Sequence, residues 1–159
     1  YLPLRDDWPM PEEGVVVKTG HGKFGTEVHT HDHCFLVDEP RSYGGDDTGP
    51  TPYDLLLAAL GSCTAMTMKL YAEKKGWPFD GASIHLTHER DHKADCEECA
   101  SNEGAGESAG IQAIQRRIEL TGENLTDEQR RNIIAIAGKC PVHRTLEGPL
   151  HIHSDANRR

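Results

Sequence analysis

The sequence predicts a single domain that contains both β-strands and α-helices. Three observations support this prediction: short apolar runs and turns alternate in the first fifty residues, residues 53–75 form an apolar stretch of helical length, and a helix-capping pattern begins at Thr126. The length of 159 residues suits one domain. Such a domain buries roughly 70% of the surface of its unfolded chain, so it needs no disulfide or metal for stability.

The first fifty residues are predicted to form strands and turns. Residues 15–17 are predicted as a strand, residues 20–25 (GHGKFG) as a turn, and residues 26–37 as a hairpin or an extended strand pair. Gly, Pro and Asp dominate residues 38–52, which predicts a loop. Residues 1–14 are predicted to form an extended N-terminal arm.

The longest predicted helix begins at Tyr53 and ends near Gly76. Its leucines and methionines cover most of the helical circumference, and no charge intervenes from Leu55 until Lys69. A helix that is apolar on nearly all sides belongs in the centre of a fold or in an interface. Because one chain with short strands covers such a helix poorly, the sequence predicts a two-fold dimer.

Two further strands are predicted at residues 82–89 and 111–120, separated by an acidic, Cys-containing loop at residues 91–110. Thr126 and Gln129 form the pattern of a capping box.

The helix that this capping box predicts ends near Gly138. Cys140 is then the predicted N-cap of a short helical turn, because Pro141 suits its first position. Residues 150–153 are predicted as a closing strand.

The composition restricts the class of partner. Acidic residues outnumber basic residues 26 to 17, the net charge is −9 and the pI is near 5.5, and no basic stripe appears, so nucleic acid is not expected as a partner. The longest uncharged run has 14 residues, shorter than the roughly 20 that a membrane span needs. We therefore expect a cytoplasmic protein without a membrane partner. An odd count of five cysteines then indicates thiol chemistry or metal binding before structural disulfides.

Two cysteines are prominent by their positions. Cys63 lies within the apolar helix, where a buried thiol is commonly only a small apolar side chain. Cys140 is predicted at a helix N-terminus, where backbone N–H groups and the helix dipole favour the thiolate, the reactive form. Lys139, His143 and Arg144 add positive charge nearby. Spacing alone does not bring the two sulfurs together.

The motifs around both cysteines resemble the OsmC/Ohr family of thiol-dependent hydroperoxide reductases. They are GGDDTGPTPYDLLLAALGSCTAMTMKLYAEKKGW and, downstream, GKCPVHRTLEG, and the likeness to the OsmC-like branch extends over residues 20–153. The resemblance implies an α+β homodimer with antiparallel sheets wrapped around two central helices, with residues 1–159 as one OsmC-like domain. It also implies that Cys63 is the peroxidatic cysteine and Cys140 the resolving cysteine.

The implied activity is a cysteine-based peroxidase. The Cys63 thiolate would reduce an organic hydroperoxide to an alcohol and become a sulfenic acid, and Cys140 would condense with it to a disulfide. An external thiol, a dithiol or a lipoyl-type reductant, would restore both thiols. No metal or organic cofactor is required.

The helper residues of better-known family members differ here. Those members use a Glu ten residues before the peroxidatic cysteine and an N-terminal Arg. Tyr53 occupies the position of the Glu, with Asp54 beside it. The turn that would carry the Arg offers Lys23 and His21, and a Lys lacks the bidentate fork of Arg. The other candidate cations are Arg41 and Arg144.

A second group of possible ligands consists of His88, His92, Cys96 and Cys99. These residue types suit zinc, although structural sites usually separate a C-x2-C pair from the other ligands by a longer loop. A disulfide, a dithiol or a solvated acidic loop are the alternatives, and the solvated loop is the default. Two further His groups would form a metal-binding face only if their strands pair: His29, His31 and His33 with His151 and His153. Cys34 is interpreted as a core residue.

Three functional hypotheses follow from these observations. The first is the peroxidase. The second is an OsmC-like module with weak catalysis that binds a small apolar ligand, a hypothesis based on the missing Glu. The third is a metal-binding protein that uses the His- and Cys-rich loop.

Overall fold

The chain is described from a computed structural model, which covers residues 13–89 and 113–156. Its contacts divide it into two compact units, residues 1–56 and residues 57–159, and each unit is considered by itself. The boundary falls within helix α1 (Pro52–Lys75), just after its first turn. Whether residues 1–159 form a single domain stays a prediction.

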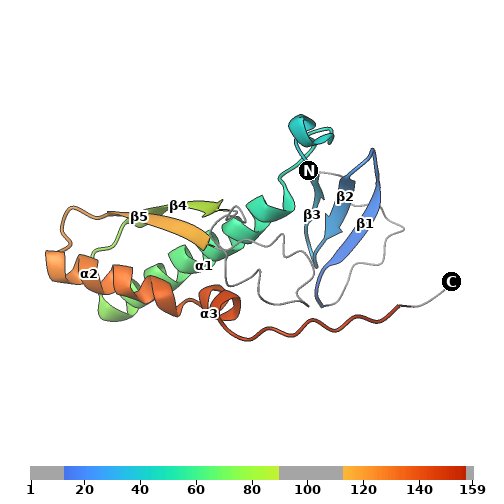
Figure 1. Cartoon of the computed structure of the whole chain (residues 1–159). Coiled ribbons are helices and arrows are strands. Elements are labelled where there is room, and N and C mark those ends of the chain that lie inside the picture. The colour runs from blue at the N-terminus through green and yellow to red at the C-terminus, as the bar shows by residue number, and fades with distance from the viewer. Residues whose placement is uncertain (1–12, 90–112, 157–159) are drawn as a thin grey trace, which may run out of the picture. The chain divides into compact units, whose positions relative to one another are not determined.

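The first unit contains a three-stranded antiparallel sheet in the order β1-β2-β3 (Figure 1). Its strands are β1 (Val16–His21), β2 (Gly25–His29) and β3 (Cys34–Val37). The predicted turn and hairpin are confirmed. After β3 the chain makes one short 3₁₀ helix, η1 (Arg41–Tyr43), before α1 begins.

The second unit combines the body of α1 with a hairpin and a helical C-terminal part (Figure 1). Strands β4 (Gly81–Glu89) and β5 (Ala113–Thr121) pair in antiparallel fashion over nine residues. Helix α2 (Asp127–Ile136), the 3₁₀ turn η2 (Ala137–Lys139) and helix α3 (Pro141–Glu147) follow.

Local chemistry fixes both ends of α1. Thr51 and Asp54 exchange side-chain hydrogen bonds with each other's backbone N–H groups at 3.0 and 3.1 Å, which caps the helix before Pro52 at its first position. At the other end Gly76 has a φ of +69°, and the N–H groups of Gly76 and Trp77 donate back to carbonyls of the last turn. This left-handed residue ends the helix, as the sequence predicts.

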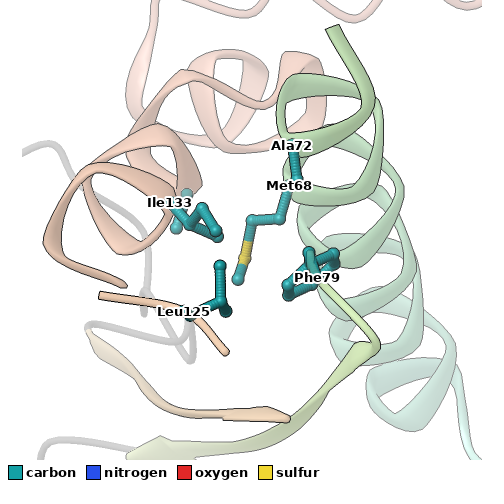
Figure 2. Packing of buried hydrophobic residues seen from close by; sticks show 6 residues of the cluster. Met68, Ala72, Phe79, Leu125 and Ile133 are labelled. Atoms are coloured by element: carbon teal, nitrogen blue, oxygen red, sulfur yellow. The ribbon is translucent and has the colours of Figure 1, made fainter. Parts of the chain in front are cut away.

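The core of the second unit lies between α1, α2 and the hairpin. Figure 2 shows Met68 of α1 directed between Ile133 of α2, Leu125 and Phe79. Met68 and Ile133 are completely buried. The inward face of the hairpin adds Ala82, Ile118 and Leu120 at its edge. At Gly61 the helix approaches β4 so closely that a Cβ would lie 2.7 Å from the Leu86 side chain.

Two predicted elements are wrong. Residues 150–153 form no strand: residues 149–156 are exposed coil and pair with no described strand, and an extended segment becomes a strand only when a neighbour accepts its backbone hydrogen bonds. The pairing of strands that would bring His29, His31 and His33 to His151 and His153 also fails, because β2 ends at His29 and residues 30–33 and 150–153 are not strands. These histidines therefore do not share a strand face.

Helix α1 is also the one described helix that is long and apolar enough to span a membrane by length and composition. The central helices of globular folds meet the same test, and α1 contributes Met68 and Ala72 to a packed core. Residues 1–12 and 90–112 lie outside the described residues, so most of the predicted arm and the acidic loop at 91–110 are not described.

Candidate active site

Cys63 lies on α1 beside an open apolar groove. Its side chain is half-buried and its thiol is free. The groove has a volume of about 430 Å³, and apolar atoms dominate its walls. It lies between α1 and the beginning of α3, and it is lined by Ala59, Ser62, Cys63, Met66, Thr67, Leu70, Pro141 and Val142.

Cys140 is completely buried at the junction between η2 and α3. It is the N-cap of α3, with Pro141 at the first helical position, as the sequence predicts. The backbone N–H of His143 donates to the Cys140 sulfur at 3.3 Å. This hydrogen bond satisfies one of the N–H groups that the first turn of a helix leaves without an intrahelical partner.

Residues next to each of the two cysteines lie close to the other cysteine. Thr64, the residue after Cys63, has its hydroxyl 3.8 Å from the Cys140 sulfur. Conversely, Pro141 and Val142, the residues after Cys140, line the groove of Cys63. The fold therefore brings the middle of α1 and the N-terminus of α3 together, although 76 positions separate Thr64 from Cys140.

Arg116 of β5 completes this cluster. Its guanidinium donates to the Thr64 hydroxyl at 3.0 Å and to the Ala137 carbonyl at 3.4 Å. Its second terminal nitrogen lies 3.3 Å from Nδ1 of His143, and Nε2 of His143 lies 2.9 Å from a Glu147 carboxylate oxygen. One cation thus connects α1, the start of η2 and α3 around Cys140.

Sequence reasoning missed Arg116 and Thr64. The signal for Arg116 was the alternation of β5, in which Ile114, Ile118 and Leu120 face inward and Arg116 occupies the inward position between them. A cation at such a position requires polar partners. Thr64 carries no comparable signal in the sequence, because its partners come from β5 and α3.

Of the other predicted site residues, only Arg144 belongs to this unit, and its backbone N–H donates to the Cys140 carbonyl at 3.1 Å. Asp54 is engaged in the cap of α1, and the Lys23 ammonium lies 4.8 Å from the centre of the Phe24 ring. Arg144 is exposed on α3. Tyr53, Asp54, Lys23 and Arg41 all belong to the first unit, so their proximity to Cys63 and Cys140 stays a prediction.

A separate polar cluster surrounds Glu27 in the first unit. Its buried carboxylate accepts hydrogen bonds from His29, at 3.1 Å, and from His21. These two hydrogen bonds hold the pKa of Glu27 below its ordinary value. Cys34 lies 3.7 Å from His29, and burial, reinforced by the Glu27 charge, raises the pKa of the Cys34 thiol. Cys34 is buried, which confirms its interpretation as a core residue.

The proposed zinc ligands are only partly described. His88 lies on β4, whereas His92, Cys96 and Cys99 lie outside the described residues. Among residues 13–89 and 113–156 no group of three or more His, Cys, Asp or Glu side chains is arranged to hold a metal ion. The metal-binding hypothesis that uses His88 together with His92, Cys96 and Cys99 stays a prediction.

Comparison with known proteins agrees with the motifs around the two cysteines. The family model of the OsmC-like proteins matches residues 44–155, which include both cysteines and Arg116. The chain belongs to the OsmC-like family. Comparison of this OsmC-like chain with curated proteins gave no match.

Solved structures share the fold of this OsmC-like protein. An OsmC-like protein from Mycoplasma pneumoniae is 20% identical, with a TM-score of 0.67 over 87% of this chain and 89% of the other. The organic hydroperoxide resistance protein OsmC from Legionella pneumophila is 15% identical, with a TM-score of 0.57 over 87% and 92%. The organic hydroperoxide resistance protein OhrB of Bacillus subtilis is 17% identical, with a TM-score of 0.55 over 85% of this chain and 90% of the other. The α+β fold class is thereby confirmed.

Proposed function

We propose that the chain is a thiol-dependent peroxidase that reduces organic hydroperoxides. One observation carries this proposal: the half-exposed thiol of Cys63 lies in an apolar groove. Pro141 and Val142, the two residues directly after the second thiol, Cys140, form part of the wall of this groove. Two thiols on adjoining elements, one open to a ligand and one buried, suit a peroxidatic cysteine and a resolving cysteine.

The proposed reaction has three steps. The Cys63 thiolate attacks the distal peroxide oxygen, the O–O bond breaks, and the alkoxide takes a proton and leaves as an alcohol. Cys63 is then a sulfenic acid, and condensation with the Cys140 thiol forms a disulfide and releases water. Two equivalents of a thiol, or one dithiol of the lipoyl type, reduce the disulfide and restore both cysteines. No cofactor takes part in these steps.

The proposed substrate class follows from the walls of the groove. Met66, Leu70 and Val142 favour an alkyl or aryl substituent over a small polar peroxide, because burying apolar surface is favourable. The names of the Legionella pneumophila and Bacillus subtilis relatives refer to organic hydroperoxide resistance, which agrees with this class. Tyr53, Asp54, Lys23, Arg41 and Arg144 stay candidates for contacts with the peroxide.

We propose further that the working form is a homodimer in the cytoplasm. Met66 and Leu70 are 70% and 53% exposed on α1, and a second copy would cover them. The cytoplasm supplies the reduced thiols that the cycle consumes.

The proposed mechanism predicts different results for the three described cysteines. Cys63→Ser is expected to abolish the consumption of cumene hydroperoxide in the presence of dihydrolipoamide, because the attacking sulfur is gone. Cys140→Ser is expected to react once and to retain a sulfenic acid that dimedone traps. Cys34→Ser serves as the matched control, because Cys34 belongs to the separate cluster around Glu27 and His29. This substitution is expected to leave turnover unchanged.

The decisive measurement is a peptide map after one equivalent of cumene hydroperoxide. A Cys63–Cys140 disulfide in the wild type supports the proposal. Full turnover by Cys63→Ser, or a disulfide between another pair of cysteines, would overturn it. Slow turnover together with a stoichiometric apolar ligand carried through purification would instead support the ligand-binding module, for which the groove of Cys63 is the candidate site.

A further inference from the structure

The positive charge next to Cys140 has no carboxylate partner among the described residues. Arg116 takes part in none of the described ion pairs, and its hydrogen-bond partners are a hydroxyl, a carbonyl and an imidazole. A half-buried guanidinium is always charged, and a charge without a counter-ion in such a place favours a negative group nearby. The Cys140 sulfur can become negative, and it contacts the same Thr64 hydroxyl to which Arg116 donates.

His143 does not supply that positive charge. A guanidinium only donates hydrogen bonds, so Nδ1 of His143 accepts from Arg116 and carries no proton. The ring proton is then on Nε2, which donates to Glu147 at 2.9 Å. Arg116 therefore also contacts the ring of His143, the residue whose backbone N–H donates to the Cys140 sulfur.

Thr64 links Arg116 to the sulfur. Its hydroxyl proton is donated to the Leu60 carbonyl at 2.7 Å, so its oxygen accepts from Arg116 and faces the Cys140 thiol. If Cys140 loses its proton, rotation of this hydroxyl would turn the O–H from the Leu60 carbonyl to the sulfur, while Arg116 still donates to the oxygen. A donor polarised in this way stabilises a thiolate more strongly than an isolated hydroxyl does.

We propose that Arg116, acting through Thr64 and His143, is a positioning residue that stabilises the Cys140 thiolate for the disulfide-forming step. The inference rests on the proposed peroxidase function. In this step Cys140 gives up its thiol proton, its sulfur bonds to the Cys63 sulfur, and the S–O bond of the sulfenic acid breaks. The hydroxide that leaves combines with the proton to form water.

The test follows both steps in a single turnover with one equivalent of cumene hydroperoxide. Dimedone trapping measures the sulfenic acid, and mass spectrometry measures the disulfide. Arg116→Gln is expected to form the sulfenic acid at the wild-type rate but to form the disulfide at least about tenfold more slowly, since hydrogen bonds to charged groups are the strong ones. Arg117→Gln is the matched control, because Arg117 is exposed on the opposite face of β5.

Two readouts separate positioning from a structural role. In Arg116→Gln the rate of disulfide formation is expected to increase more with rising pH than in the wild type, because solvent base must then form the thiolate. Arg116→Lys is expected to restore part of the rate, since Lys keeps the charge but lacks the fork that serves both Thr64 and His143.

A second substitution tests the same link if Arg116→Gln folds poorly. Thr64→Val removes the hydroxyl at nearly constant volume and is expected to slow the disulfide step alone. Thr64→Ser keeps the hydroxyl and is expected to keep the rate of the disulfide step. Disulfide formation as fast in Arg116→Gln or in Thr64→Val as in Arg117→Gln would overturn the inference. If the wild type itself forms no sulfenic acid, the peroxidase function fails and this inference fails with it.

Discussion

Asp38 organises the loop that follows β3. Its carboxylate is buried, and one oxygen accepts from the backbone N–H of Glu39 at 2.8 Å. The other oxygen accepts from the N–H groups of Asp46 and Thr48 and, at 2.8 Å, from the Thr48 hydroxyl. A loop rich in Gly and Asp thus has a defined conformation because one ionised side chain satisfies four donors.

This arrangement predicts an acid-sensitive contribution to stability. The Thr48 hydroxyl, followed by the backbone donors, holds the pKa of Asp38 below its ordinary value despite burial. A lowered pKa stabilises the folded chain above the unfolded value, near 3.8, and this stability is lost as the pH falls through the folded value. Asp38→Asn is expected to be less stable at neutral pH and to lose part of the acid dependence.

Urea unfolding at several pH values measures both effects. Asp47→Asn is the control, because Asp47 is exposed and Asn tolerates its positive φ of 55°. An Asp38→Asn chain with the full acid dependence of the wild type would contradict the assignment.

The site residues differ in how far the sequence predicts them. Cys140 is predictable as an N-cap, because Pro141 and the ending of the preceding helix are local signals. Arg116 is visible only as a cation in an inward strand position. Its partners Thr64 and His143 lie 52 and 27 positions away, and the packing of β5 on α1 and α3, which no local pattern encodes, brings them together.

At the scale of elements, the predicted helix boundaries are confirmed where capping is local. Thr126 accepts from the backbone of Gln129, and the Gln129 side chain accepts from Thr126, which is the capping box that the sequence indicates. The predicted strands β4 and β5 are also confirmed. They were predictable because half-buried and exposed side chains alternate along most of the nine residues of each strand. The predicted strand at 150–153 fails for the opposite reason, since a strand depends on a partner that its own sequence does not specify.

The cap of α2 gives a prediction about stability. Thr126→Ala removes the side-chain acceptor and is expected to destabilise the chain by about 1 kcal/mol. Thr126→Ser keeps the hydroxyl and is the matched control. Urea unfolding of the two variants measures the difference, and equal midpoints for Ala and Ser would show that the cap contributes nothing to the stability of the second unit.

For the molecule as a whole, one face of α1 stays exposed although it is apolar: the face that carries Met66 and Leu70. Met68 and Ala72 enter the core, whereas Met66 and Leu70 project from the same helix and line open apolar grooves on it. A helix apolar on nearly all sides therefore has one face covered by its own chain and one face exposed. Its pattern predicted that exposed face but not which residues would form it.

A second copy of the chain on this face would bury Met66, and this makes the proposed dimer testable by substitution. Wild type is expected to sediment as a dimer at micromolar concentration. Met66→Lys is expected to weaken the association at least about tenfold, because burying an unpaired charge is costly. Gln115→Lys adds the same charge on the exposed face of β5 and is expected to leave the dimer intact. A monomeric wild type, or a Met66→Lys chain that associates as tightly as Gln115→Lys, would show that α1 functions without a partner.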